Sequence, residues 1–398
     1  MAGVPHHGWW RPRLRDHRLG TQPLLRACMS TRIKAAVLNA APGTLDIEEL
    51  FIDDPGPDEV LVRIAYAGLC HSDLHEMDGT FESDTPIVLG HEAVGEVVEV
   101  GSAVTEFGPG ATVVTCLSVY CGSCEFCLAG QQTLCARRTQ LQQGRARPRL
   151  TNSRGAAVRA TAGIGGFAEM ALVHKNSVVG ITPGVRLQTA SVLGCAVTTG
   201  MGSVLQSACV RPGQTVAVIG LGGIGFSAVQ AARLAGAAQI IGVDVVPEKL
   251  EQAKFFGATD VVNARETDPV AAVRALTSGG TDHAFEAVGS GATAGQAFAM
   301  LRPGGVATVM GMIPDSHSIP LRGSELFMQE KSLRGSFMGS NHFKVDIPMY
   351  LQFARAGLLQ LDELVTAEYS LETINEGFDA LASGREIRVV VGIGATST

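Results

Sequence analysis

Four cysteines lie close together, at a spacing that suits a metal ion. They follow the pattern C-x2-C-x2-C-x7-C, at Cys121, Cys124, Cys127 and Cys135. Four thiolates can close a tetrahedral Zn²⁺ site with no open coordination position, which is typical of a structural site. An iron–sulfur cluster also takes four cysteine thiolates and remains the alternative. A disulfide framework suits a small secreted domain better than a chain of 398 residues.

A glycine-rich segment has the spacing of a dinucleotide-binding turn. The pattern G-x-G-x-x-G stands at Gly220, Gly222 and Gly225, between an expected strand at 215–219 and an expected helix at 226–235. Gly220 would permit the tight turn, Gly222 would let the backbone approach a pyrophosphate, and Gly225 would let helix and strand pack closely. The start of the helix would offer free N–H groups to the phosphates.

An acidic residue in the right place indicates which dinucleotide would bind. Asp244 ends the next expected strand, at 239–243, nineteen positions after Gly225. Its carboxylate would accept hydrogen bonds from the adenosine ribose and repel a 2′-phosphate, which favours NAD over NADP. Lys249 could reach the same ribose. A strand-end turn residue is the structural alternative for Asp244.

A second set of potential metal ligands is dispersed along the chain. Cys70 lies in G-L-C-H-S-D-L-H, His91 in G-H-E-A-V-G and Cys195 in G-C-A-V-T-T-G. Spacing alone does not assemble them. A buried cysteine is often a small hydrophobic residue, and a histidine can be purely structural.

Composition limits the classes of protein to which the chain can belong. Its length suits two domains, and 46% hydrophobic with 17% charged residues indicates a large buried core. The net charge of −7 argues against nucleic-acid binding, and no apolar run approaches a membrane span.

Clustered thiols predict a reducing, cytoplasmic location. Residues 1–28 hold five arginines and no apolar core, so we expect a disordered extension rather than a secretory signal.

The elements that would position these residues fall into two patterns. Residues 34–114 favour β-structure, with strands expected at 34–38, 59–66 and 93–100. Residues 116–165 resemble a loop, and 137–159 is expected to be exposed. From residue 214, strands alternate with helices, which predicts a parallel α/β sheet. Further strands are expected at 260–262, 283–286, 305–309 and 388–392, and helices at 248–256, 347–356 and 371–383.

Taken together, these motifs resemble the zinc-containing alcohol dehydrogenases of the medium-chain dehydrogenase/reductase superfamily. The resemblance runs from about residue 33 to the C-terminus, with the motifs in family order. It implies an α/β protein with a GroES-like, β-rich catalytic domain and a Rossmann doubly wound parallel sheet. The expected divisions are an extension at 1–32, the catalytic domain at 33–198 with its structural-zinc loop at 116–136, the Rossmann domain at 199–343, and a segment at 344–398 that returns to the catalytic domain.

The resemblance also implies a catalytic role for the dispersed ligands. Cys70, His91 and Cys195 would hold a catalytic zinc with one position open for water or substrate, so that each chain would bind two zinc ions. Asp73 would orient the ligand histidine, and Glu92 would approach the metal during ligand exchange. A proton would pass from the substrate hydroxyl through Ser72 to His75 and on to solvent.

Other family positions imply cofactor contacts. A basic residue beside the pyrophosphate corresponds to His71, and a C-terminal arginine there corresponds to Arg388. The remaining expected contacts with NAD(H) are Thr199, Gly223, Ile224, Gly311 and the segment 335–339. Phe81 and Phe167 are candidate pocket walls, with core packing as the favoured role for each.

The resemblance leaves several functions open. We expect hydride transfer between a primary or secondary alcohol and NAD, giving an aldehyde or ketone. A glutathione-dependent formaldehyde dehydrogenase is the alternative enzyme, as is a nicotinoprotein that keeps NAD(H) permanently bound. A non-enzymatic zinc-binding relative is disfavoured because all three catalytic ligands are present. The only expected partners are a small alcohol or aldehyde and further copies of the chain, in a homodimer or homotetramer.

Overall fold

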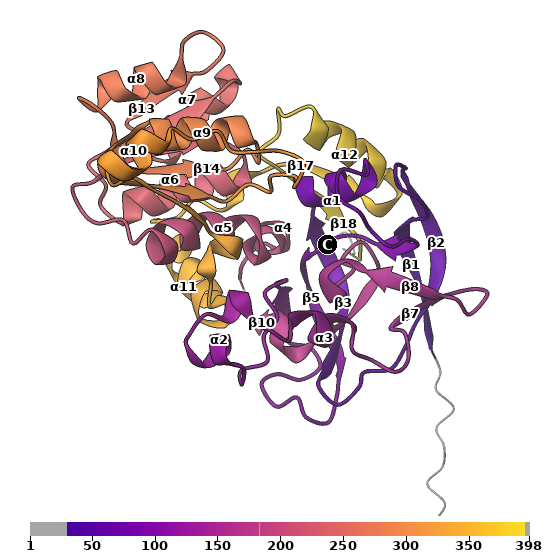
Figure 1. The fold of residues 1–398 in the computed structure, drawn as a ribbon. Coiled ribbons are helices and arrows are strands. Elements are labelled where there is room, and N and C mark those ends of the chain that lie inside the picture. Colours follow the sequence, from indigo (N-terminus) through magenta and orange to yellow (C-terminus); the bar gives the residue numbers. More distant parts are fainter. Residues whose placement is uncertain (1–29, 183, 395–398) are drawn as a thin grey trace, which may run out of the picture.

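The computed structural model describes residues 30–182 and 184–394, arranged in two lobes (Figure 1). Most of the expected N-terminal extension therefore lies outside the described residues. Thr31 and Arg32 already belong to the first strand. No helix in the described part of the chain is long and apolar enough to cross a membrane.

The first lobe is built on two β-sheets. A closed barrel has the strand order β1-β2-β7-β8-β4, and a second sheet has the order β10-β6-β5-β3-β18-β17, with β9 also paired to β3. β3 is buried along nearly its whole length, which suits a strand that pairs with β5, β9 and β18. The strands are β1 Thr31–Leu38, β2 Leu45–Ile52, β3 Glu59–Gly68, β4 Ile87–Val88, β5 Glu92–Val100, β6 Thr112–Thr115, β7 Leu150–Asn152, β8 Ala157–Ala160, β9 Met170–His174, β10 Val178–Gly180, β17 Val365–Ser370 and β18 Arg388–Gly392.

The second lobe contains a six-stranded, fully parallel sheet. Its order is β13-β12-β11-β14-β15-β16, in which β11 lies beside both β12 and β14. Helices connect the strands, as parallel pairing requires. The strands are β11 Thr215–Ile219, β12 Gln239–Asp244, β13 Asp260–Asn263, β14 Thr281–Glu286, β15 Leu301–Val309 and β16 Ser332–Gly335; the helices are α6 Gly223–Leu234, α7 Pro247–Phe256, α8 Pro269–Leu276, α9 Gly291–Ala299 and α10 Gly323–Met328.

The remaining helices cap or join the lobes. α1 follows β3, and α5 runs from the first lobe towards the second, where it packs against α6. The chain then returns to the first lobe, where β18 pairs with the carboxyl end of β3. The helices are α1 His71–Met77, α2 Glu125–Leu128, α3 Arg138–Gln143, α4 Leu187–Ser191, α5 Ala196–Gly202, α11 Phe343–Arg355 and α12 Ile374–Ala382.

Comparison with the expected elements shows one clear error. The expected strands and helices are all present, and β18 has the expected bounds. The segment 116–165, however, is not simply a loop, since it contains α2, α3, β7 and β8. Its arginines are not all exposed either: Arg145 and Arg149 form ion pairs with Asp53 and Glu59 and are largely buried. Their partners lie about 90 residues away in sequence, so local periodicity could not reveal them.

Candidate active site

Four potential ligands from distant parts of the chain meet between the lobes. The ligand atoms of Cys70, His91, Glu92 and Cys195 all lie within 4.8 Å of one another. Cys70 caps the start of α1, His91 directly precedes β5, Glu92 is the first residue of β5, and Cys195 precedes α5. The fold thus brings together the three dispersed residues that spacing alone could not assemble.

Hydrogen bonds fix the direction of the histidine. His91 Nδ1 lies 3.2 Å from Asp73 Oδ1, which also accepts the N–H of Gly90. The other carboxylate oxygen of Asp73 accepts the N–H of Cys70. His91 Nε2 is buried and has no hydrogen-bond partner among the described residues. Since one ring nitrogen is held by a carboxylate and the other points at two thiols, the arrangement fits a zinc ligand.

The thiols also suit a metal. A hydrogen bond with Cys195, together with the neighbouring His91, lowers the pKa of the Cys70 thiol well below its usual range. The thiolate is the form that binds zinc. Two sulfurs, one imidazole nitrogen and a position left over are the donor set of a catalytic zinc site.

An arginine occupies the side of this cluster that faces the second lobe. Arg388 Nη2 lies 2.6 Å from Glu92 Oε2, and both side chains are almost fully buried. Burial raises the pKa of Glu92 to about 7, while the Arg388 guanidinium opposes that shift. The Arg388 side chain also passes Gly223, where an added Cβ would lie 2.2 Å from Arg388 Cδ. Arg388 therefore contacts both the ligand cluster and the start of α6.

α1 carries the two residues expected to move the proton. Ser72 is half-buried in its first turn, two residues after Cys70. His75 lies one turn further on, with Nδ1 3.5 Å from Asp78 Oδ2 and its ring edge-to-face with Phe81. Phe81 thus packs on His75. Phe167 is fully buried against Phe378, which indicates core packing.

The glycine-rich turn has the geometry expected for a dinucleotide site. Gly220 has φ +90°, and a Cβ on Gly225 would lie only 1.8 Å from Gly220 O. A Cβ on Gly222 would meet nothing within 4 Å, so the backbone there faces open space. Asp244 Oδ2 accepts the N–H of Leu221 at 2.7 Å, which ties this turn to the end of β12.

Cationic groups gather around this turn. Burial lowers the pKa of Lys249, and the neighbouring Asp244 opposes the shift. Burial also lowers the pKa of His71 at the start of α1, with Cys70 acting in the opposite direction. Arg388 and Lys249 place positive charge near the free N–H groups of α6, which suits a pyrophosphate, whereas His71 offers a neutral hydrogen-bond donor.

A left-handed turn forms another wall of the site. Met338, Gly339 and Ser340 have φ values of 51°, 68° and 51°. The turn packs against α5, so that Met338 Sδ lies 3.9 Å from Cys195 Sγ and 3.6 Å from Thr199 Oγ1. Sequence reasoning placed 335–339 near the cofactor but missed the Met338 side chain, because no local pattern predicts a positive φ for methionine.

Ile224 and Gly311 are two further residues expected at the cofactor. Ile224, in the first turn of α6, packs against the hydrophobic core. Gly311 follows β15, where an added Cβ would lie 2.2 Å from Gly289 N and 2.8 Å from the buried Glu286 Oε2. A side chain is therefore excluded at Gly311.

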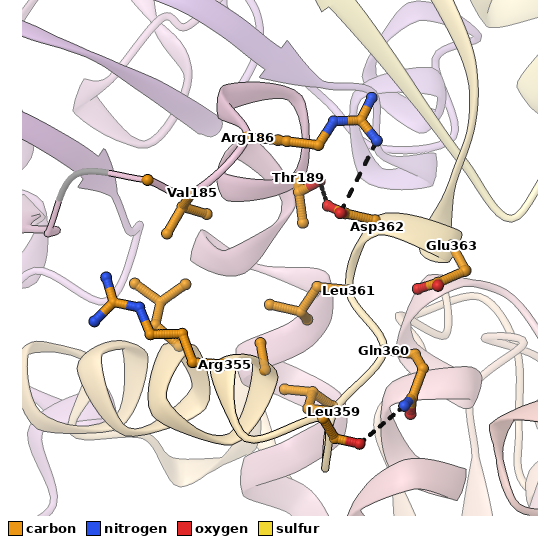
Figure 2. Close-up of a pocket in the computed structure, with 13 residues that line it drawn as sticks. Val185, Arg186, Thr189, Arg355, Leu359, Gln360, Leu361, Asp362 and Glu363 are labelled. Atoms are coloured by element: carbon orange, nitrogen blue, oxygen red, sulfur yellow. Dashed lines mark hydrogen bonds and ion pairs between the residues drawn. The ribbon is translucent and has the colours of Figure 1, made fainter.

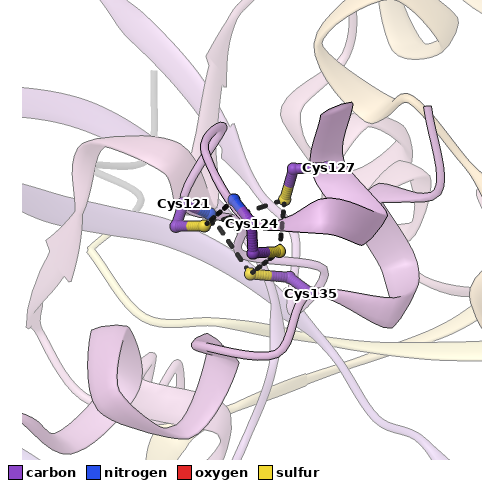
Figure 3. Close-up of side chains that lie close together, drawn as sticks. All are labelled: Cys121, Cys124, Cys127 and Cys135. Carbon is purple, nitrogen blue, oxygen red and sulfur yellow. Dashed lines mark hydrogen bonds between the residues drawn. The ribbon is translucent and has the colours of Figure 1, made fainter. Parts of the chain in front are cut away.

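The four clustered cysteines form a separate site on the first lobe (Figure 3). The sulfur–sulfur distances are 3.9 Å between Cys121 and Cys127, 3.5 Å between Cys124 and Cys127, and 4.0 Å between Cys124 and Cys135. A tetrahedral Zn–S4 centre has sulfur–sulfur edges of about 3.8 Å. Hydrogen bonds from the backbone of Ser123 and Cys124 lower the pKa of Cys121 to about 6. The site therefore fits zinc with no open position.

A further cavity lies away from both clusters. It has a volume of about 350 Å³ and lies between α4 and the segment that follows α11 (Figure 2). Arg186 and Thr189 approach Asp362 on one side, above an apolar floor that includes Leu359 and Leu361. None of the expected site residues lines it.

Two family models match the chain. The alcohol dehydrogenase GroES-like domain matches residues 56–183, and the zinc-binding dehydrogenase model matches residues 223–354.

Relatives match over nearly their whole length. The chain is 39% identical to an NDMA-dependent alcohol dehydrogenase from Amycolatopsis methanolica, over 90% of this chain and 98% of the relative. It is 36% identical to S-(hydroxymethyl)glutathione dehydrogenase from Photobacterium damsela subsp. piscicida, over 90% and 99%. The crystal structure of benzyl alcohol dehydrogenase from Acinetobacter calcoaceticus aligns with a TM-score of 0.84 at 31% identity, over 92% and 100%. The chain therefore belongs to the zinc-containing alcohol dehydrogenases of the medium-chain dehydrogenase/reductase superfamily, enzymes that use zinc and NAD(H).

Proposed function

We propose that this enzyme transfers hydride between a primary or secondary alcohol and NAD at the cluster of Cys70, His91 and Cys195. The observation that carries the proposal is the unpartnered, buried His91 Nε2 beside two thiols, next to a glycine turn whose Gly222 faces open space. Zinc supplies Lewis acidity there when bound, and NAD is the hydride acceptor. The four-cysteine site holds a second zinc with a structural role.

The protein's own side chains then have separate tasks. Asp73 keeps His91 in the tautomer that leaves Nε2 free for a metal. Ser72 accepts the proton of the substrate hydroxyl and passes it towards His75, which releases it to solvent. Arg388 and His71 hold the pyrophosphate, and Asp244 holds the adenosine ribose. Thr199 and Met338 confine the nicotinamide beside Cys195.

Removing one ligand tests this assignment. Cys70→Ala should lose the catalytic zinc and nearly all turnover while it still binds NADH. Metal content by mass spectrometry and NADH fluorescence titration would measure the two effects separately. Turnover retained in a Cys70→Ala enzyme that contains one zinc per chain would contradict the proposal.

The relatives favour two variants of this chemistry. One relative is named NDMA-dependent and another acts on S-(hydroxymethyl)glutathione, at 39% and 36% identity. A permanently held cofactor would appear as the absorbance of reduced nicotinamide in the purified protein. A glutathione-dependent reaction would require glutathione for turnover of formaldehyde. A screen of primary, secondary, allylic and aromatic alcohols with NAD and NADP would then define the substrate.

We also propose a homodimer formed through the edge of the parallel sheet. β16 is the last strand of that sheet and is mostly exposed. Beside it in sequence, α10 exposes Leu326, Phe327 and Met328. An unpaired strand edge next to apolar side chains suits pairing with a second copy.

A cytoplasmic location fits the free thiols of the described cysteines.

A further inference from the structure

His75 and Asp78 lie close together at the C-terminal end of α1, and the proposed reaction assigns a role only to His75. Asp78 is the C-cap residue of α1, and its carboxylate lies beside the imidazole of His75. The distance from His75 Nδ1 to Asp78 Oδ2 is 3.5 Å. The two side chains are 31% and 47% exposed, but Nδ1 itself is buried and makes no hydrogen bond among the described residues, so the carboxylate acts on it from ion-pair distance.

The orientation of the carboxylate is fixed from its other side. Asp78 Oδ1 accepts the N–H of Thr80 at 2.8 Å, which leaves Oδ2 directed at His75. This hydrogen bond and the contact with His75 hold the pKa of Asp78 below its usual range, although partial burial acts against them. The carboxylate is therefore charged and can only accept a hydrogen bond.

The imidazole is fixed as well. The ring of Phe81 meets the ring of His75 edge-to-face, with centroids 5.2 Å apart at 90°. The backbone N–H of Phe81 also donates to the carbonyl of His75 at 3.0 Å. Phe81 thus limits the rotation of the ring and keeps Nδ1 on the side of Asp78.

We propose that Asp78 is a positioning residue that holds His75 in the Nδ1–H tautomer, so that Nε2 accepts the proton leaving the active site. The inference rests on the proposed function of His75. Nε2 takes up one proton while the Nδ1 proton passes to Asp78 and from there to water, which leaves a neutral imidazole in the Nε2–H tautomer. Release of the Nε2 proton to solvent and return of a proton from Asp78 to Nδ1 then restore the starting tautomer. Asp78 and Phe81 line a cleft of about 720 Å³ into which that proton can leave.

The contact between His75 and Asp78 extends beyond the motifs. Asp78 lies outside the G-L-C-H-S-D-L-H motif, three residues after His75. A carboxylate beside a histidine favours the tautomer with the proton on the nearer ring nitrogen, because the N–H dipole then points at the negative charge.

Substitution by asparagine tests the tautomer directly. In Asp78→Asn the amide oxygen can still accept the N–H of Thr80, while the amide nitrogen faces His75 and donates to Nδ1. The tautomer of His75 should therefore invert to Nε2–H. ¹⁵N-histidine NMR of the full-length protein measures this, with the His75 signals identified by their loss in His75→Asn.

A neighbouring carboxylate provides the control. Asp84 lines the same cleft but pairs with Arg159, so Asp84→Asn should leave the tautomer unchanged. In single-turnover experiments Asp78→Asn should slow hydride transfer roughly tenfold at neutral pH. In the His75→Asn background the same change should have no further effect.

Two results would overturn the inference. One is a His75 tautomer that is the same in the wild type, Asp78→Asn and Asp84→Asn proteins. The other is slow hydride transfer in Asp78→Asn that persists in the His75→Asn background. The tautomer measurement does not depend on whether zinc occupies the cluster at Cys70, so failure of the proposed function would be recognised separately, in the Cys70→Ala enzyme.

Discussion

Asp244 has a structural contact as well as a proposed role in cofactor choice. Its Oδ2 accepts the N–H of Leu221, and its Oδ1 accepts the N–H groups of Val245 and Val246. Oδ1 uses both of its lone pairs on these two N–H groups, whereas Oδ2 keeps one lone pair for a ribose hydroxyl. The carboxylate therefore shapes the glycine turn and still has an acceptor for the proposed contact with the ribose.

Removing the charge of Asp244 should relax the choice between NAD and NADP. We expect Asp244→Asn to lower the ratio of kcat/KM for NAD over NADP by at least tenfold, because a charged hydrogen bond contributes about 1.5–3 kcal/mol. Glu248→Gln, an exposed acid in the first turn of α7, serves as the control. If the ratio is unchanged while the melting temperature falls, Asp244 is structural only.

The sequence predicts single residues well only where a motif carries them. The ligand cysteines and the glycine turn were predicted, and the fold brings Cys70, His91 and Cys195 together. Met338 and Asp78 were missed. Met338 reaches Cys195 because its backbone is left-handed, in a turn that packs against α5. The role of Asp78 depends on where the His75 ring lies relative to its carboxylate.

At the scale of elements, two glycines of one turn should respond differently to the same substitution. Gly225→Ala places a Cβ 1.8 Å from Gly220 O and should destabilise the fold by more than about 2 kcal/mol. Gly222→Ala meets nothing within 4 Å and should keep the melting temperature but weaken NADH binding at least tenfold. Thermal melting and NADH titration distinguish the two. Normal NADH affinity in Gly222→Ala would exclude a phosphate contact there.

The four-cysteine site should contribute to stability rather than to chemistry. Cys124→Ser should reduce the zinc content from two ions per chain to one and lower the melting temperature by about 5 °C or more. The exposed Cys209 lies outside both clusters, so Cys209→Ser is the matched control. Visible absorbance from iron in the wild-type protein would instead identify an iron–sulfur cluster.

Elements were predictable where their pattern is local. β18 was placed correctly from its apolar run, and the parallel strands from their alternation with helices. β7 and β8 were missed because the surrounding arginines look solvent-exposed in sequence. Arg145 and Arg149 become buried only because Asp53 and Glu59, far away in the chain, neutralise them.

For the whole molecule, the exposed side chains of α10 make the proposed dimer testable. Phe327 is 78% exposed beside the β16 edge, so Phe327→Glu should shift the protein from dimer to monomer. Val345, 68% exposed on α11, provides the control in Val345→Glu. Analytical ultracentrifugation over micromolar concentrations measures the change. A wild-type protein that sediments as a monomer throughout would contradict the dimer.

The position of β18 has a consequence for how a newly made chain matures. Val390 pairs with Gly68, so one of the last described strands lies between β3 and β17, inside the sheet rather than at its edge. The strands of the parallel sheet lie between residues 215 and 335, so all of them leave the ribosome before β18 does. The nucleotide-binding lobe can fold during translation, whereas the first lobe must wait with the flank of β3 uncovered. Arg388 reaches Glu92 only at that final step, so the ligand cluster reaches its final form late in biosynthesis.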